Sequence, residues 1–81
     1  MGTKIWLDNG LVDEKDASIS VYDHGFLYGD GVFEGIRVYN GTIFYEQEHL
    51  ERLYNSAKYI RLEIPMNIEQ MSEAMRKTVS A

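Results

Sequence analysis

The stretch that decides the fold is HGFLYGDGVFEGIRVYNG, residues 24–41. Its eighteen residues hold five glycines, four Phe or Tyr side chains and one arginine, which is more backbone freedom than an ordinary strand needs. It ends in Asn40-Gly41, and an Asn-Gly pair between apolar runs is the strongest short-range signal for a two-residue hairpin turn. We therefore predict an antiparallel pair between residues 32–39 and residues 42–45, with a positive φ at both turn residues.

A second Asn-Gly pair, Asn9-Gly10, predicts an earlier hairpin in which residues 5–7 pair with residues 11–12. Between the two hairpins the chain is mostly polar. We expect a short helical turn within residues 13–20, followed by a short strand at residues 19–22.

The second half of the chain has helical periodicity. From Glu48 onward, the apolar residues at helical spacing are Leu50, Leu53, Ala57 and Ile60. They predict a helix that ends before Pro65. Asn67 predicts the start of a second helix because its side chain can accept a hydrogen bond from the amide of Gln70. The apolar face of that helix is Ile68, Met71, Met75 and Val79. Strands followed by two helices favour an α+β fold, an antiparallel sheet with both helices packed on one face.

Composition narrows the classes of function. The 81 residues make at most one small domain, and the net charge of −5 disfavours nucleic acid or an anionic membrane as a partner, because both need clustered Lys and Arg. There is no cysteine, and the amino end lacks a basic and then apolar signal pattern. We expect a soluble cytoplasmic chain. With only two histidines, no metal site is expected.

The glycine spacing does not fit a nucleotide loop. Gly29, Gly31 and Gly35 are spaced G-x-G-x-x-x-G, no Gly-Lys-Ser/Thr follows, and the glycines lead into an expected strand. Phosphate-binding loops place such glycines before a helix instead.

Alternation along the expected strand predicts a recess. Phe33, Gly35 and Arg37 share one face, where an apolar wall, a missing side chain and a guanidinium could hold an organic acid. The alternative is that Gly35 marks a β-bulge and Arg37 lies in solvent. Glu34 faces the other way, so either it has a partner, with His24 as one candidate, or that face is partly wet.

These motifs carry a family resemblance. The stretches that match are DHGFLYGDGVFEGIR at residues 23–37, the Asn-Gly turn at 40–41, EHLERL at 48–53, SAK at 56–58 and Ile-Pro at 64–65. The chain resembles the amino-terminal part of class IV aminotransferases that use pyridoxal 5′-phosphate, and it is most similar to the branched-chain amino acid type. D-amino acid aminotransferases and aminodeoxychorismate lyases share the layout. Residues 1–81 would then be part of the small amino-terminal domain.

The resemblance assigns roles to five residues. Arg52 matches the arginine that grips the cofactor phosphate, although Glu48, four residues earlier, offers an ordinary exposed ion pair instead. Phe33 and Gly35 match positions that line the substrate pocket, and Arg37 lies beside them.

Tyr28 resembles a tyrosine that reaches the active site of the neighbouring subunit, which implies a homodimer. Its alternative is local packing in a loop. None of the four lysines matches the lysine that carries the cofactor, so we expect that lysine beyond Ala81 and no catalytic residue within the chain.

The resemblance implies an enzyme that moves an amino group between branched-chain L-amino acids (Val, Leu, Ile) and 2-oxoglutarate. The alternatives are the D-amino acid aminotransferase and aminodeoxychorismate lyase activities of the same class, or an interaction domain that has lost catalysis.

Overall fold

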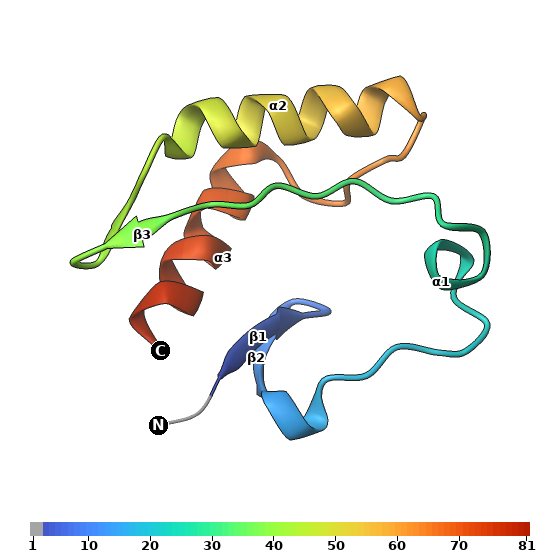
Figure 1. The fold of residues 1–81 in the computed structure, drawn as a ribbon, viewed down its shortest axis with the longest axis horizontal. Helices are drawn as coiled ribbons and strands as arrows, with labels where there is room; N and C mark the ends of the chain where they lie inside the picture. Colours follow the sequence, from blue (N-terminus) through green and yellow to red (C-terminus); the bar gives the residue numbers. More distant parts are fainter. Residues whose placement is uncertain (1–2) are drawn as a thin grey trace.

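The computed structural model describes residues 3–81 and confirms an α+β fold (Figure 1). In chain order the elements are β1 (Lys4–Leu7), β2 (Gly10–Asp13), the 3-10 turn η1 (Glu14–Asp16), α1 (His24–Tyr28), β3 (Val38–Tyr39), β4 (Thr42–Ile43), α2 (Glu46–Tyr59) and α3 (Ile68–Ser80). Within these residues, the structure contains no helix with the length and apolar composition needed to cross a membrane.

The strands form two separate antiparallel pairs, β1 with β2 and β3 with β4, so the expected single sheet is corrected. The predicted strand at residues 32–39 is reduced to its last two residues. Its partner ends at Ile43, and Tyr45 then adopts a φ of 53° that turns the chain into α2. Residues 29–37 consequently have no neighbouring strand, although the Phe44 amide still donates to the Arg37 carbonyl at 2.9 Å.

The two hairpin turns differ from each other. Asn40 and Gly41 have φ values of 51° and 77°, as predicted. In the first hairpin the positive φ values belong to Asp8 and Asn9, at 50° and 73°, and Gly10 already pairs within β2. The predicted Asn9-Gly10 turn was therefore wrong by one residue. Asp and Asn both tolerate the left-handed region, so this turn does not need a glycine.

The link between the hairpins holds one predicted and one unpredicted element. The helical turn is present as η1, but the strand predicted at residues 19–22 is wrong, because these residues are exposed and lead into α1. Asp23 begins α1 by accepting a hydrogen bond from the Phe26 amide at 3.1 Å. Gly29 ends it with a φ of 69°, a conformation that favours glycine. The glycine-rich stretch thus contains a short helix.

Both long helices are confirmed. α2 begins at Glu46 and ends before Pro65. Asn67 caps α3 as predicted, because its side chain accepts from the Gln70 amide at 2.8 Å. The Gln70 side chain accepts from the Asn67 amide at 2.9 Å, which completes a capping box.

The core is small. Among the described residues, the buried apolar side chains are Leu50, Ala57 and Ala74, which lie where α2 packs against α3. α3 in turn contacts β1, so the two helices do not share one face of a sheet as expected. Ile60 was predicted on the buried face of α2 but is 42% exposed, because the helix ends one residue earlier.

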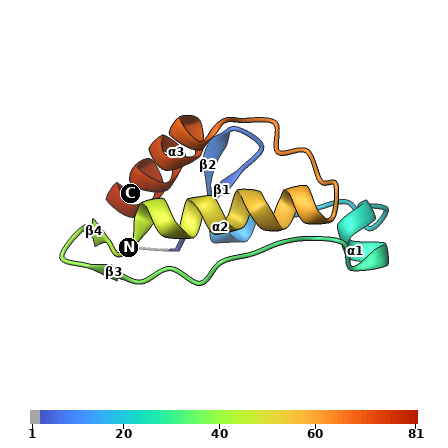
Figure 2. The same ribbon diagram turned by 90° about the horizontal axis from the view of Figure 1, so that it is seen from above.

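Residues 29–37 run alongside α2 in both ribbon views (Figure 1, Figure 2).

Candidate functional site

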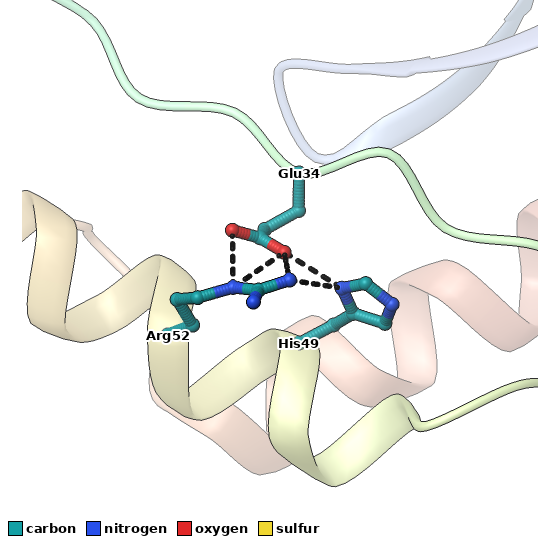
Figure 3. Close-up of polar contacts among 3 residues, drawn as sticks. All are labelled: Glu34, His49 and Arg52. Atoms are coloured by element: carbon teal, nitrogen blue, oxygen red, sulfur yellow. Dashed lines mark hydrogen bonds and ion pairs between the residues drawn. The ribbon is translucent and has the colours of Figure 1, made fainter.

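The extended segment 29–37 places a glutamate against α2 (Figure 3). Val32, Glu34 and Ile36 are half-buried, whereas residues 31, 33, 35 and 37 are exposed. The two-residue alternation predicted from the sequence is therefore confirmed, even though the segment belongs to no sheet. The inward face brings Glu34 to α2, and the outward face is left open.

Glu34 is bound by two side chains of α2. The Arg52 Nη2 group donates to Glu34 Oε1 at 2.7 Å, and Arg52 Nε donates to Oε2 at 3.0 Å. His49 Nδ1 lies 2.6 Å from Glu34 Oε1, a distance at which a protonated Nδ1 donates to the carboxylate. Both carboxylate oxygens are thus engaged, and the Glu34 side chain keeps only 12% of its exposure.

Helix geometry explains this arrangement. His49 and Arg52 are three residues apart on α2, so they lie on the same face one turn from each other. Arg52 therefore reaches Glu34, which lies on a separate segment, and within residues 3–81 it makes no ion pair with Glu48. The candidate partner His24 is also wrong for Glu34, because His24 pairs with Asp30 at 2.7 Å.

The contacts keep Glu34 ionised. Hydrogen bonds from Arg52, and then from His49, lower the pKa of Glu34 from 4.5 to about 2. The hydrogen bonds to Glu34 in turn raise the pKa of Arg52 above its ordinary value. The pair is consequently a carboxylate and a guanidinium at any pH near neutrality.

Arg52 retains donors for a second anion. A guanidinium has five N–H groups, and Glu34 occupies the edge formed by Nε and Nη2. Figure 3 draws no contact to the third nitrogen, and the Arg52 side chain remains 66% exposed. Arg52 also lines a shallow depression of about 360 Å³ whose other lining residues are Val32, Asn55, Ser56, Tyr59 and Ile60. An anion placed there would meet a fixed positive charge beside amide and hydroxyl groups.

The remaining predicted site residues lie elsewhere on the surface. Phe33, Gly35 and Arg37 share the outward face of the segment, opposite the Glu34 contact, and Phe33 is 88% exposed. Tyr28 lies in α1, 72% exposed, with its ring centroid 4.6 Å from that of His24. The structure thus groups three predicted residues on one face and keeps Arg52 and Tyr28 apart from them.

Nothing in the local backbone requires a glycine at position 35. Gly35 has no positive φ, and a Cβ built on it meets no atom within 4 Å. The bulge alternative is wrong, because a bulge needs a paired strand and this segment has none. Its missing side chain leaves open space on the outward face instead.

The contact among Glu34, His49 and Arg52 is the part of the site that the sequence analysis missed. A usable signal was present, since the three-residue spacing of His49 and Arg52 places two nitrogen donors on one helix face. The sequence alone does not say that residues 29–37 pass beside that face. That approach depends on how the segment and α2 meet in three dimensions.

A family model described as amino-transferase class IV matches residues 31–81. The chain belongs to the class IV amino-transferase family. A Methanocaldococcus jannaschii protein that bears the name of a branched-chain-amino-acid aminotransferase is 54% identical over 76 residues, which are 94% of this chain and 26% of that protein. A D-alanine aminotransferase of Listeria monocytogenes is 43% identical over 77 residues, which are 95% of this chain and 27% of that protein.

Two solved structures share the fold. The branched-chain aminotransferase of the archaeon Thermoproteus uzoniensis, with norvaline, has a TM-score of 0.89 and 44% identity over 100% of this chain and 29% of its own. A second branched-chain amino acid aminotransferase, complexed with N-(5′-phosphopyridoxyl)-L-glutamate, has a TM-score of 0.89 and 40% identity over 99% of this chain and 28% of its own. The chain spans about a quarter of the length of these relatives.

Proposed function

We propose that the whole protein is a branched-chain amino acid aminotransferase dependent on pyridoxal 5′-phosphate, and that this chain supplies its phosphate-binding arginine. The observation that carries the proposal is Arg52, an exposed guanidinium held at one edge and open at the other. Its place in a chain 54% identical to a protein with a branched-chain aminotransferase name supports the substrate class.

The residues present suit the phosphate of the cofactor. Arg52 offers a free edge, and Asn55 and Ser56 line the same depression with amide and hydroxyl groups that can donate to phosphate oxygens. When bound, pyridoxal phosphate supplies an electron sink for bond breaking at the amino acid α-carbon. The contribution of this chain is to bind and orient the phosphate end.

The outward face of segment 29–37 suits the substrate. Phe33 provides an apolar surface, the open space at Gly35 leaves room for a branched side chain, and Arg37 provides a cation for a carboxylate. Within residues 3–81 the Arg37 guanidinium makes no ion pair, so its charge is available to a ligand.

We further propose that the protein works as a homodimer in which Tyr28 contributes to the site of the neighbouring subunit. Tyr28 is 72% exposed on α1, and among the described residues only the His24 ring lies beside its ring, tilted by 43°. An exposed tyrosine of this kind offers an apolar ring and a hydroxyl to a second surface.

A second candidate function is D-amino acid transamination, which is favoured by the 43% identity to a D-alanine aminotransferase. The same arginine, phosphate group and 2-oxo acid would serve it. The two activities differ in the hand of the amino donor, and therefore in the substrate side of the site and not at Arg52. An aminodeoxychorismate lyase or a non-catalytic interaction domain would give no transfer with either donor.

The test is an amino-transfer assay on the purified full-length protein. It is supplied with pyridoxal phosphate, 2-oxoglutarate and either L-leucine or D-alanine, and glutamate formation is measured. We expect transfer from L-leucine, with a kcat/KM at least about ten-fold above that for D-alanine. A preference for D-alanine would establish the second candidate, and no transfer from either donor would contradict both.

A further inference from the structure

We propose that Glu34 is a positioning residue that holds Arg52 in the orientation needed to bind a phosphate group. The inference rests on the proposed function, because it takes the ligand of Arg52 to be the cofactor phosphate. Glu34 itself would touch neither cofactor nor substrate. It would act by fixing one edge of the guanidinium so that the opposite edge points at the ligand.

The division of the guanidinium into two edges carries this inference. Arg52 donates to both oxygens of Glu34, at 2.7 Å from Nη2 and 3.0 Å from Nε, so the side edge is saturated. The end edge, formed by Nη1 and the second Nη2 proton, has the fork geometry that matches phosphate. A carboxylate bound at the end edge would compete with phosphate, whereas Glu34 at the side edge leaves Nη1 open. Nη2 has one further contact, to His49 Nδ1 at 3.3 Å.

Arg52 needs such a restraint because it is otherwise free to move. Its side chain is 66% exposed, and a long exposed arginine loses rotamer freedom whenever it binds a ligand. Glu34 is only 12% exposed and is also held by His49, so the carboxylate is a fixed point for the guanidinium. Arg52 thus meets the phosphate already ordered.

The same contact ties segment 29–37 to α2. Within the described part of the chain, residues 30–36 make no backbone–backbone hydrogen bond, so side-chain contacts must hold them in place. Glu34 provides two such contacts, an ion pair with Arg52 and a hydrogen bond with His49. Its neighbours Phe33 and Gly35 form the proposed substrate face. Glu34 therefore joins the phosphate end of the site to the substrate end.

The experiment compares two ligands that differ only in phosphate. The dissociation constants of pyridoxal 5′-phosphate and pyridoxal are measured on the full-length apoprotein by absorbance or fluorescence titration. Their ratio reports the contribution of the phosphate group, because a general loss of folding changes both constants together. Glu34→Asp is the variant, since it keeps the charge and withdraws the carboxylate by one methylene.

We expect Glu34→Asp to lower the phosphate preference, the pyridoxal constant divided by the pyridoxal phosphate constant, about three- to ten-fold. The matched control is Glu51→Asp, which makes the same change next to Arg52 on a side chain that binds Gln47 at 3.1 Å. This control should leave the preference unchanged. In an Arg52→Ala background, Glu34→Asp should not change the phosphate preference further, because the arginine that Glu34 positions is gone.

Three results would overturn the inference, and each can be told from the others. If Arg52→Ala lowers the preference but Glu34→Asp does not, Arg52 binds phosphate without help from Glu34. If both constants weaken equally in Glu34→Asp, Glu34 serves only the fold. If Arg52→Ala itself leaves the preference unchanged, the proposed function of Arg52 fails, and the inference fails with it.

Discussion

The ionisation of Glu34 makes the stability of the fold depend on pH. Its pKa falls from 4.5 to about 2 because Arg52 and His49 bind the ionised form. A carboxylate whose pKa is lowered by folding stabilises the folded state at pH values above its pKa in the unfolded chain. This contribution is lost as the pH falls from about 4.5 towards 2. We expect wild type to resist urea better than Glu34→Gln at pH 7, with most of that advantage gone by about pH 3. A difference in urea midpoint that stays constant with pH would contradict the assignment.

Gly35 provides a second prediction at the residue scale. Because nothing lies within 4 Å of a Cβ at this position, Gly35→Leu should fold normally and fill the open space on the proposed substrate face. We expect the KM for L-leucine in the full-length protein to rise about ten-fold, which corresponds to about 1.4 kcal/mol. Gly10→Leu is the control, because Gly10 is equally open but lies in β2, outside segment 29–37. Equal KM values for the two variants would show that position 35 has no special role.

The helices depend on local sequence, and their caps can be tested directly. Asn67 and Gln70 bond to each other's amides at the start of α3, so Asn67→Ala removes one half of a capping box. We expect the free energy of unfolding to fall by about 0.5–2 kcal/mol in chemical denaturation. Asn55→Ala, at an exposed site within α2, should change it by less than about 0.5 kcal/mol or raise it slightly, since alanine is the better helix former. Equal losses in both variants would mean that the cap contributes nothing.

The elements that the sequence predicted well are the ones set by neighbours along the chain. The Asn40-Gly41 turn, the capping box at Asn67 and both long helices depend on residues a few positions apart. The strand at residues 32–39 was predicted too long because a strand needs a distant partner, and the positive φ of Tyr45 removes that partner. The apolar alternation of residues 32–37 still gave the correct faces, because burial follows the side-chain pattern even without a ladder.

Prediction of the site was limited in the same way, because its contacts join residues far apart in the chain. Arg52 and the face of Phe33, Gly35 and Arg37 were predicted as site residues from a family resemblance and from alternation, and their roles stay predictions. For Glu34 the sequence analysis offered a partner, with His24 as one candidate, or a partly wet face; the structure gives it a partner, but His49 and not His24. Only the approach of segment 29–37 to α2 distinguishes His49 from His24.

At the scale of the whole molecule, the described chain buries few side chains. Leu50, Ala57 and Ala74 are the buried apolar residues within residues 3–81, while Phe33 and Tyr59 are 88% and 89% exposed. We expect the 81-residue polypeptide, expressed alone, to self-associate as its concentration rises and to bind a hydrophobic dye, because so much apolar surface faces water. Sedimentation velocity measures the association. A monomer at all concentrations with a sharp, cooperative thermal transition would contradict this prediction and show that the core is enough to keep the polypeptide folded and monomeric.

The central claim is that this chain brings the cofactor phosphate to Arg52, and titration of the full-length apoprotein with pyridoxal 5′-phosphate tests it most directly. Arg52→Ala removes a charge-assisted contact, so we expect the dissociation constant to rise about ten- to a hundred-fold. The urea unfolding curve serves as a folding control: its midpoint should fall, because Glu34 loses its arginine partner, but the transition should stay cooperative and so show that the variant is folded. An unchanged dissociation constant for pyridoxal phosphate in a folded Arg52→Ala protein would contradict the claim.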